Sequence, residues 1–486
     1  MNTLKKLEPA PVWQYFEEIC RIPRPSKKED KIIDYLTAFA KKHNLDLKKD
    51  PAGNLLITKS ASPGLEDKKT VVLQSHMDMV CEKNSGIDHN FDTDPVIPYI
   101  EGEWVKAKGT TLGADDGIGM AAQLALLASD DLPHGKIECL FTVDEETGLT
   151  GAFALKPGFF EGSVLINLDS EDEGELFIGC AGGIDMIATI EFDNEEIPSS
   201  HKGFKVAVGG LQGGHSGDDI HKGLGNSIKI LNRFLWNVNN RFDMNLVRFN
   251  GGNVRNAIPR EADALFSVHH DEADDVEKYL VSFSEMVSRE LSGRDEGFHI
   301  SMVSASLPSN AMDEDSRLDL LYSLYGCPNG VMAWSQHISD LVESSTNLAT
   351  IRTENNKITI TTSQRSSSDS SKADISAMVE SVFRLANAGI RKTGGYPGWE
   401  PDYDSRLMEI CKSAYQRLFG DKPLVRTIHA GLECGLFLEK YPGLDMISFG
   451  PTIKGAHSPD ERLHIGSVEK FWDLLKEVLK DIPDRD

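Results

Sequence analysis

Three acidic side chains stand in a row directly after an apolar stretch of the sequence. The segment IECLFTVDEE, residues 137–146, predicts a strand that ends in Asp144, Glu145 and Glu146. Carboxylates packed together at the end of a buried strand repel one another and lose hydration, and both effects cost free energy unless cations neutralise them. The row of acids therefore indicates a binding site for metal ions.

Two other predicted strands end in residues that can bind metal ions. His76 and Asp78 follow the apolar segment TVVLQ, and Asp169 ends the segment VLINLD. Ligand sites in α/β sheets are built where strands end. On an extended chain His76 and Asp78 point to the same side, so Asp78 can orient the imidazole for a metal, or the two can act separately. A simple polar pair at a strand end is the alternative for these two residues.

Two adjacent acids precede a predicted helix. Asp115 and Asp116 stand in a glycine-flanked turn before the apolar segment GIGMAAQLALLAS, residues 117–129. Capping a helix is the ordinary function of Asp at such a place, and Asp116 fits it. Two caps would be redundant, so Asp115 is available as a metal ligand. His457, in the loop GAHSPDERLHIGS, would otherwise be a surface residue, but here it completes a set of ligands.

The combined ligand set, two histidines with several carboxylates, suits zinc and, less specifically, cobalt or manganese. Two divalent ions would be balanced by Asp115, Glu146, Asp169 and one shared hydroxide. If Asp115 bridges, each ion gains one histidine and one further carboxylate. Successive side chains on an extended segment point apart, so Glu145 is free to act as general base when Glu146 binds metal.

The elements that must position these residues alternate between strands and helices in residues 1–186 and again in residues 398–486. This alternation predicts an α/β catalytic domain with a sheet flanked by helices. Residues 187–397 change to alternating strand patterns with separate helices, which predicts an inserted α+β lid domain. The insertion is long enough to contain two similar subdomains.

The composition limits the classes of partner and compartment. The chain of 486 residues has 76 acidic and 51 basic side chains, and its net charge of -25 argues against a nucleic-acid or anionic-membrane surface. We expect no secretory signal at the N-terminus and no membrane-spanning segment. The seven cysteines are scattered and form no C-x-x-C pair, which favours reduced thiols in a cytoplasmic protein.

Five segments carry a resemblance to a known family. SHMDMV, GADDGIG, DEETGLTGA, NLDSEDEG and GAHSPDE resemble the metal-site segments of the zinc peptidase family that contains carnosinase, peptidase T and succinyl-diaminopimelate desuccinylase. Within that family, the long insertion and the phrases GGHSGDDIH, GGNVRNAIP and HAGLECG are similar to the aminoacyl-histidine dipeptidase type, also called peptidase D or bacterial carnosinase. The resemblance runs through essentially the whole chain. It implies a di-zinc peptidase catalytic domain with a central mixed sheet, together with a lid domain.

For the metal site, the resemblance implies one zinc ion on His76, Asp115 and Asp169 and a second on Asp115, Glu146 and His457. It implies Glu145 as the general base that assists a zinc-bridging hydroxide, and Asp78 as the residue that orients His76. It also implies a cis peptide bond between Asp115 and Asp116.

For the substrate, the resemblance implies a small peptide, a dipeptide of the Xaa-His type that includes carnosine-like compounds. His215 is expected to hydrogen-bond the carbonyl oxygen as negative charge develops, and Asn256 and Arg365 to hold the carboxylate end. Gly431 and Glu433 are expected to line the same cleft from the catalytic domain, with Glu433 able to accept a free amino group. Without the resemblance, His215 would fit a turn histidine equally well, and Arg365 a surface charge.

Other functions are compatible with parts of the sequence. An amidase or deacylase of N-acyl amino acids would use the same metal core. A non-catalytic metal-binding protein would lack a ligand or the base, and none is missing. A calcium-stabilised domain would have mostly oxygen ligands, whereas two histidines indicate a transition metal. The insertion could replace a partner's lid, so a monomer and a homodimer both agree with the sequence.

Overall fold

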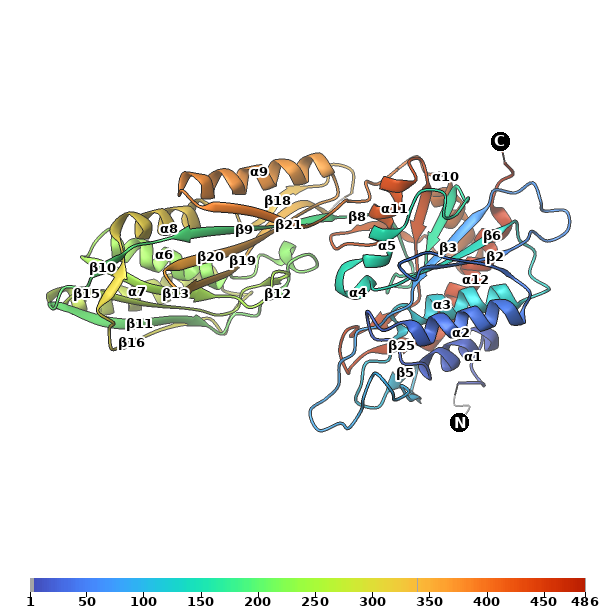
Figure 1. Cartoon of the computed structure of the whole chain (residues 1–486), viewed down its shortest axis with the longest axis horizontal. Coiled ribbons are helices and arrows are strands. Elements are labelled where there is room, and N and C mark those ends of the chain that lie inside the picture. The colour runs from blue at the N-terminus through green and yellow to red at the C-terminus, as the bar shows by residue number, and fades with distance from the viewer. Residues whose placement is uncertain (1–3, 339, 486) are drawn as a thin grey trace. The chain divides into compact units, whose positions relative to one another are not determined.

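The computed structural model describes residues 4–338 and 340–485, which form two compact units (Figure 1). Unit 1 takes in the chain up to Gly179, the segment Trp399–Thr427 and the chain from Leu432 onward. Unit 2 consists of Cys180–Gly398 and the short segment Ile428–Gly431. The predicted insertion, residues 187–397, lies within unit 2.

Unit 1 is built on an eight-stranded sheet with the order β1-β2-β6-β3-β7-β23-β8-β22. Its strands are β1 (Asp46–Lys49), β2 (Leu55–Lys59), β3 (Val71–His76), β6 (Ile137–Thr142), β7 (Val164–Asn167), β8 (Glu175–Cys180), β22 (Leu424–Ile428) and β23 (Asp445–Ser448). Strands β6, β3, β7 and β23 run parallel, whereas β1 pairs antiparallel with β2, β2 with β6 and β8 with β23. The central sheet is therefore mixed, as the family resemblance implied.

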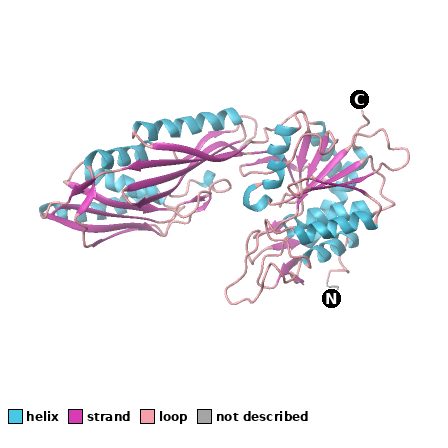
Figure 2. Ribbon diagram, in the orientation of Figure 1, coloured by secondary structure: helices cyan, strands magenta, loops and turns pink. Residues whose placement is uncertain are grey.

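The parallel strands β3, β6 and β7 are buried along their whole length, which is typical of strands covered by helices on both faces (Figure 2). The helices of unit 1 are α1 (Ala10–Cys20), α2 (Asp30–Lys42), α3 (Ala114–Ala128), α4 (Glu145–Gly148), α5 (Thr150–Ala154), α10 (Arg406–Phe419), α11 (Cys434–Lys440) and α12 (Ile465–Asp481). Helix α3, the predicted helix over residues 117–129, packs on β3 and against α1. Helix α10 packs on β23 and against α12.

The strand order brings distant segments of the sequence together at one edge of the sheet. Strand β3 lies between β6 and β7, and all three run in the same direction. Because the carboxyl ends of parallel strands meet at one edge, the residues at or after these three ends become neighbours. A second sheet, with the order β24-β25-β5-β4, carries the loop that connects β24 with β25. Its strands are β4 (Pro98–Glu101), β5 (Trp104–Ala107), β24 (Ile453–Lys454) and β25 (Arg462–His464).

Unit 2 is built on an antiparallel sheet of nine strands, in the order β16-β11-β15-β13-β19-β20-β9-β21, with β18 beside β19. The strands are β9 (Gly182–Glu191), β11 (His201–Gly209), β13 (Met244–Gly251), β15 (Ala262–His269), β16 (His299–Ser304), β18 (Gly330–Trp334), β19 (Val342–Glu354), β20 (Lys357–Ser366) and β21 (Gly389–Tyr396). The helices are α6 (Ser227–Asn239), α7 (Ala273–Glu290), α8 (Glu314–Gly326) and α9 (Asp369–Leu385), with 3-10 turns at Ile220–Lys222 and His270–Glu272. Two short pairs lie outside the sheet, β10 (Asn194–Glu196) with β17 (Asn310–Met312) and β12 (Gly214–His215) with β14 (Ala257–Ile258).

The large sheet of unit 2 contains one pattern twice. Elements β11, α6, β13, β15, α7 and β16 follow one another along the chain, and their strands lie in the order β16-β11-β15-β13. Elements β9, α8, β19, β20, α9 and β21 have the corresponding order β21-β9-β20-β19. The two halves meet where Gly251 of β13 pairs with Ile351 of β19. Each half is thus a strand-helix-strand-strand-helix-strand motif, and the first is inserted between β9 and α8 of the second.

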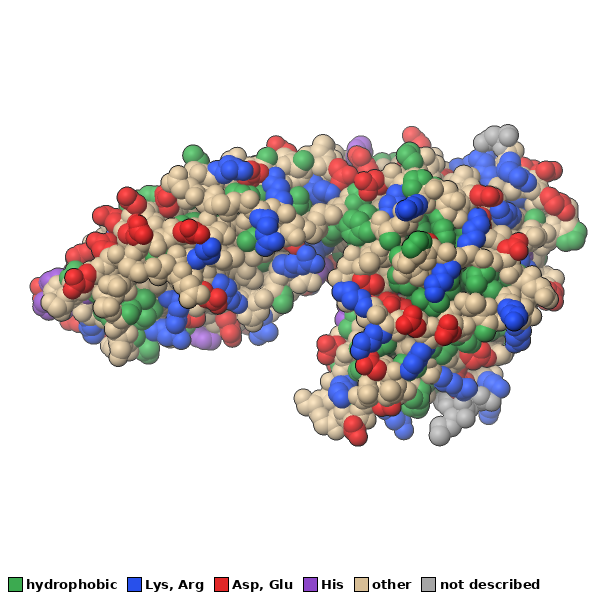
Figure 3. All heavy atoms as spheres, viewed as in Figure 1, with side chains coloured by type: hydrophobic (Ala, Val, Ile, Leu, Met, Phe, Trp, Pro, Cys, Tyr) green, Lys and Arg blue, Asp and Glu red, His purple; other side chains and the backbone are tan. Residues whose placement is uncertain are grey.

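Three features relate to the predicted absence of a membrane span, the acidic charge and the reduced cysteines. None of the helices in the described part of the chain is long and apolar enough to cross a membrane. Acidic and basic side chains are interspersed over both units in the view of Figure 3, so the acidic excess does not form one patch on that face. The seven cysteines carry free thiols.

Candidate metal centre

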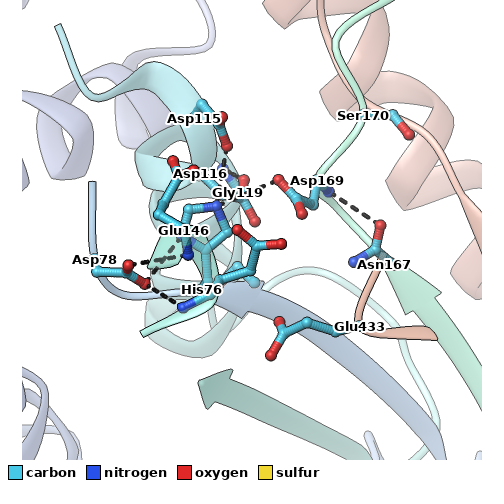
Figure 4. A network of polar contacts seen from close by, with 12 residues as sticks. His76, Asp78, Asp115, Asp116, Gly119, Glu146, Asn167, Asp169, Ser170 and Glu433 are labelled. Atoms are coloured by element: carbon cyan, nitrogen blue, oxygen red, sulfur yellow. Dashed lines mark hydrogen bonds and ion pairs between the residues drawn. The ribbon is translucent and has the colours of Figure 1, made fainter. Parts of the chain in front are cut away.

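The carboxyl edge of the unit 1 sheet carries candidate ligands from three segments (Figure 4). His76 is the last residue of β3, and Asp169 follows shortly after the end of β7. Glu145 and Glu146 begin α4, directly after Asp144, whose φ is 50°. The prediction that these two glutamates lie on an extended segment is wrong, because the chain turns at Asp144 into a short helix.

Asp115 and Asp116, at the start of α3, differ in what their carboxylates contact. The peptide bond between them is cis, and both have backbone angles outside the helical range. Oδ1 of Asp116 accepts a hydrogen bond from the backbone amide of Gly119 at 3.1 Å, so Asp116 caps the helix. The carboxylate of Asp115 instead faces His76 and His457.

Asp115 lies between two groups of candidate ligands. Its Oδ1 is 3.0 Å from Nε2 of His76, and that nitrogen is 3.4 Å from Oδ1 of Asp169. Its Oδ2 is 3.2 Å from Nε2 of His457, and that nitrogen is 3.1 Å from Oε2 of Glu146. Either group could hold one metal ion. Two groups that share one carboxylate are the arrangement expected for two ions with a bridging ligand.

The electrostatics of both groups fit divalent cations. Burial by itself would raise the pKa of Asp115, but contacts with His457 and His76 hold it well below its usual range. In return, Asp115 and Glu146 raise the pKa of His457 to about 11. Oε1 of Glu146 is buried and has no hydrogen-bond partner among the residues that the structure describes. Carboxylates that raise the pKa of a histidine in this way also favour a bound metal ion, whose positive charge would take the place of the proton.

Glu145 has the surroundings of a general base. Burial raises the pKa of its carboxyl group well above the ordinary value, and the nearby charges of Asp169 and Glu146 raise it further, although His76 opposes them. A base works best when its pKa is close to the operating pH, and a raised carboxyl pKa moves in that direction. Glu145 is also within reach of His76 and Glu146, so it lies next to the candidate ligands.

Asp78 connects His76 with the turn that carries the two glutamates. Its Oδ1 accepts a hydrogen bond from the backbone amide of Glu145 at 3.0 Å and lies 3.4 Å from Nδ1 of His76. Its Oδ2 accepts hydrogen bonds from the Ser26 hydroxyl at 2.7 Å and from the Glu146 amide at 3.3 Å. Burial opposes ionisation, but the contacts with His76 and these donors lower the pKa of Asp78 to about 2. Asp78 therefore accepts hydrogen bonds from the backbone of the turn that carries the candidate base and lies close to the imidazole.

Glu461 was not singled out in the sequence, yet its buried carboxylate holds the Asp115 turn. Oε2 accepts hydrogen bonds from the backbone amides of Leu112 at 2.7 Å and Gly113 at 3.0 Å. Oε1 accepts them from Ala114 at 2.7 Å and from Asp115 at 3.4 Å. Glu461 belongs to the same β24-β25 loop as His457, the candidate histidine ligand of the second group. One loop therefore supplies a candidate ligand and also holds the backbone of the Asp115 turn.

Arg24 is a second residue of the site that no sequence pattern indicated. Its buried guanidinium donates hydrogen bonds to the backbone oxygens of Met77, Asp78 and Gly113. Gly113 has a φ of 70°, and a Cβ there would lie 2.7 Å from Nη2 of Arg24, so both the backbone angle and the space require glycine. Arg24 thereby ties the end of β3 to the Asp115 turn.

Three of the predicted substrate-binding residues, His215, Asn256 and Arg365, lie near one another in unit 2. His215 lies in β12, which pairs with β14, and Asn256 directly precedes β14. The carbonyl oxygen of Asn256 accepts a hydrogen bond from the Ser216 amide at 2.8 Å. Nδ1 of His215 is 3.0 Å from Oδ2 of Asp218. The hydrogen bond with His215, and more weakly the charge of Arg365, lower the pKa of Asp218 although burial opposes this. Arg365 thus lies near the same loop.

Arg365 is largely buried, with 8% of its surface exposed. Its Nε has no hydrogen-bond partner, and no ion pair joins it to any described carboxylate, while Nη1 donates to the Tyr396 hydroxyl at 3.3 Å. Gly431 packs against the same tyrosine, since a Cβ there would lie 2.8 Å from the Tyr396 ring. Gly431 therefore belongs to unit 2, whereas the sequence predicted that it belongs to the catalytic unit.

His429 is another residue of this region that no sequence pattern indicated. Its Nε2 lies 2.7 Å from the Ser345 hydroxyl, and burial lowers the pKa of His429 to about 3.

Glu433, the last predicted substrate-binding residue, lies in unit 1. It directly precedes α11 and is fully buried. Figure 4 shows its carboxylate extending toward His76.

A model of the family described as Peptidase family M20/M25/M40 matches residues 72–481, a range that includes all five candidate metal ligands. The chain belongs to this peptidase family. Within the M20 peptidases, a cytosol non-specific dipeptidase of Escherichia coli (strain K12) is 45% identical over 483 residues, which are 99% of this chain and 100% of the relative. These matches confirm the family that the five segments indicated.

Solved structures agree with this assignment of the M20 fold. The crystal structure of an aminoacylhistidine dipeptidase from Vibrio alginolyticus superposes with a TM-score of 0.91 at 46% identity and covers 99% of both chains. A tripeptidase from Staphylococcus aureus has the same fold at 17% identity, with a TM-score of 0.57 over 98% of this chain and 99% of that one. The predicted combination of a central mixed sheet with a further α+β unit is confirmed as the M20 fold.

Replacing Glu461 with Gln tests whether this residue positions the metal centre. The amide group cannot accept hydrogen bonds on both sides, so the Asp115 turn should loosen and zinc affinity should fall by about 10–100-fold. Competition with a chromogenic chelator measures the affinity, and circular dichroism checks the fold. Asp460→Asn changes an exposed neighbour in the same loop and should keep wild-type affinity. Equal zinc affinity in Glu461→Gln and wild type would show that Glu461 has no positioning function.

Proposed function

We propose that this M20 peptidase is a cytoplasmic, metal-dependent dipeptidase that hydrolyses dipeptides, among them Xaa-His and carnosine-like substrates. The observation that carries the proposal is the carboxylate of Asp115 between two groups that each contain one histidine and one further carboxylate. The names of the relatives, a cytosol non-specific dipeptidase and an aminoacylhistidine dipeptidase, support the substrate class. Free thiols and the first of these names support the cytoplasm.

The metal ligands of this proposal are His76, Asp115 and Asp169 for one ion and Asp115, Glu146 and His457 for the other. Zinc is the first choice for such a set of imidazoles and carboxylates, and cobalt or manganese are the alternatives. Ions bound there would lower the pKa of a water molecule and polarise the scissile carbonyl group.

Glu145 is the general base in this proposal and transfers the proton. Its carboxylate takes a proton from the attacking water and passes it to the leaving amine. Asp78 acts through its neighbours, because it binds the Glu145 amide and faces Nδ1 of His76. The geometry of the base and of one ligand therefore depends on the same carboxylate.

Unit 2 supplies groups for the rest of the substrate. An unpaired, largely buried guanidinium is costly, and the carboxylate end of a peptide would pair with Arg365 in a bidentate way. Asn256 contributes a polar contact to the same end, and the absence of a side chain at Gly431 lets the Tyr396 ring pack closely against it. His215 donates a hydrogen bond to the carbonyl oxygen as negative charge develops there.

Substitution of Glu145 by Gln tests the general base. The change keeps the shape of the side chain but removes its capacity to take up a proton, so kcat should fall by about 100–10,000-fold with zinc content unchanged. Steady-state kinetics on Ala-His and metal analysis of the purified variant are the measurements. Glu145→Asp, which keeps a carboxylate at a shorter reach, should retain more activity than the amide. Full activity in Glu145→Gln would remove this residue from the mechanism.

Substitution of Arg365 by Lys tests the carboxylate contact. Lysine keeps the positive charge but loses the bidentate geometry, so KM for dipeptides should rise by roughly 10-fold or more while kcat changes less. Arg391→Lys, at an exposed position of the same sheet, is the matched control. Esterified dipeptides, which lack the carboxylate, should be equally poor substrates for both Arg365→Lys and wild type. A KM unchanged by Arg365→Lys would contradict the assignment.

A substrate panel tests the proposed function as a whole. The zinc-loaded enzyme should hydrolyse Xaa-His and other dipeptides at least about 10-fold faster, in kcat/KM, than tripeptides and N-acetyl amino acids. Parallel assays with manganese and cobalt identify the best metal. A preference for N-acetyl amino acids would instead assign the amidase or deacylase activity that the metal core also permits.

A further inference from the structure

Asn347 is a buried polar residue of unit 2 whose amide group is held in one orientation. It lies in β19, and only 1% of its surface is exposed. Its Nδ2 donates a hydrogen bond to the backbone oxygen of Ala257, in β14, at 2.8 Å. Because this bond occupies the nitrogen end of the amide, the oxygen Oδ1 needs a different partner.

Oδ1 of Asn347 is left without such a partner. It is buried and accepts no hydrogen bond from any residue that the structure describes. Nε of Arg365 is also buried and unpaired in that part of the chain. Unsatisfied buried polar atoms cost free energy, so they indicate a ligand that supplies the missing hydrogen bonds when they lie near each other.

The strand register places Asn347 beside the proposed contacts for the substrate's carboxylate end. Ser345 of β19 is paired with Arg365 of β20, and Asn347 is the next residue of β19 on the same face of the sheet. Asn347 also binds Ala257, and Asn256, the other proposed carboxylate contact, directly precedes Ala257. The unpaired oxygen of Asn347 therefore belongs to the region of unit 2 that is expected to bind the C-terminal residue of the substrate.

We propose that Asn347 accepts a hydrogen bond from the side chain of the substrate's C-terminal residue. The contact makes the enzyme prefer a neutral N–H donor at this position, above all the imidazole of histidine. This inference rests on the proposed dipeptidase function and on Arg365 as the carboxylate contact. It assigns Asn347 as a specificity-determining residue, with no part in the cleavage of the peptide bond.

The spacing of the two contacts suits a histidine side chain. Alternate residues of a strand are separated by about 6.6 Å, so a group bound by Arg365 and a group bound by Asn347 lie several ångström apart. The ring of a C-terminal histidine extends that far from the carboxylate and carries an N–H group at its edge. The hydroxyl of a C-terminal serine lies too close to the carboxylate to reach Asn347.

The same groups discriminate against other classes of side chain. An apolar side chain, such as that of leucine, leaves Oδ1 of Asn347 without a hydrogen bond. A lysine or arginine side chain brings a positive charge next to the guanidinium of Arg365, and like charges repel each other. A neutral imidazole supplies the missing donor without added charge, so the contact favours histidine over both classes.

A purely structural role for Asn347 makes a different prediction. The hydrogen bond from Nδ2 to Ala257 connects β19 with β14, and its loss would affect every dipeptide to the same extent. The hydrogen bond to Oδ1 exists only with substrates that carry an N–H donor on the C-terminal side chain. The ratio of activities on substrates with and without that donor therefore distinguishes the two roles.

The test compares Ala-His with Ala-Leu and with the two Ala-His derivatives that carry a methyl group on one or the other ring nitrogen. At about pH 8 the imidazole is neutral, so neither methylated derivative has a ring N–H. Zinc-loaded wild type should prefer Ala-His to each of the other three by at least about 10-fold in kcat/KM. Steady-state kinetics on the four substrates measure these ratios.

Replacing Asn347 with Ala removes the acceptor. The preference for Ala-His over the other three substrates should then fall by about 10-fold, whatever the change in the overall rate, because the substrate N–H and Oδ1 act as a coupled pair. Asn310→Ala makes the same chemical change at an exposed position of β17 and should keep the wild-type ratios.

The outcomes separate this inference from the proposed function. If wild type hydrolyses no dipeptide, the proposed function fails and the inference fails with it. If wild type hydrolyses all four substrates at similar rates, the dipeptidase stands and the inference is overturned without any variant. If Asn347→Ala lowers all four equally, the role of Asn347 is structural and the inference is overturned. If Asn347→Ala does not fold, Asn347→Ser, whose shorter side chain keeps a hydroxyl, must show the same fall in preference.

Discussion

The crowding of carboxylates at the carboxyl edge of β6, β3 and β7 is the constraint on which the rest of the structure depends. Each buried carboxylate has to be offset by donors or by positive charge. Asp78 and Glu461 are satisfied largely by backbone amides, and these amides belong to the turns that carry the candidate base and the shared ligand. Asp115, Glu146 and Asp169 face only histidines among the strong contacts of the described chain, so these three are the acids that bound cations would neutralise.

Acids that are adjacent in the sequence make different contacts because the backbone turns at or beside them. Asp116 caps α3, whereas the non-helical angles of Asp115 direct its carboxylate to both histidines. In the same way the turn at Asp144 starts α4, so that Glu146 joins the second ligand group and Glu145 stays free beside it. The candidate metal centre thus depends as much on buried carboxylates that accept hydrogen bonds from the backbone as on the candidate ligands themselves, which is the usual arrangement behind metal ligands.

Those features of the fold that depend on local sequence patterns could be predicted from the sequence. Apolar runs that end in acids located the strands and their ends within a few residues, and the family resemblance was confirmed over the whole chain. The sequence could not reveal Glu461, whose amide partners lie 348 residues away at Gly113, because no local pattern links them. Nor could it assign the short segment around His429 to unit 2, since that assignment depends on pairing with Ala181 and Ser345, far away in the chain.

The central claim is that Asp115 bridges two metal ions. A crystal structure of the zinc-loaded protein, with anomalous differences collected at the zinc edge, tests it most directly. We expect two peaks, each about 2 Å from one oxygen of Asp115. His76 and Asp169 should ligate the first ion, and His457 and Glu146 the second. A single peak, or a second ion that Asp115 does not ligate, would contradict it.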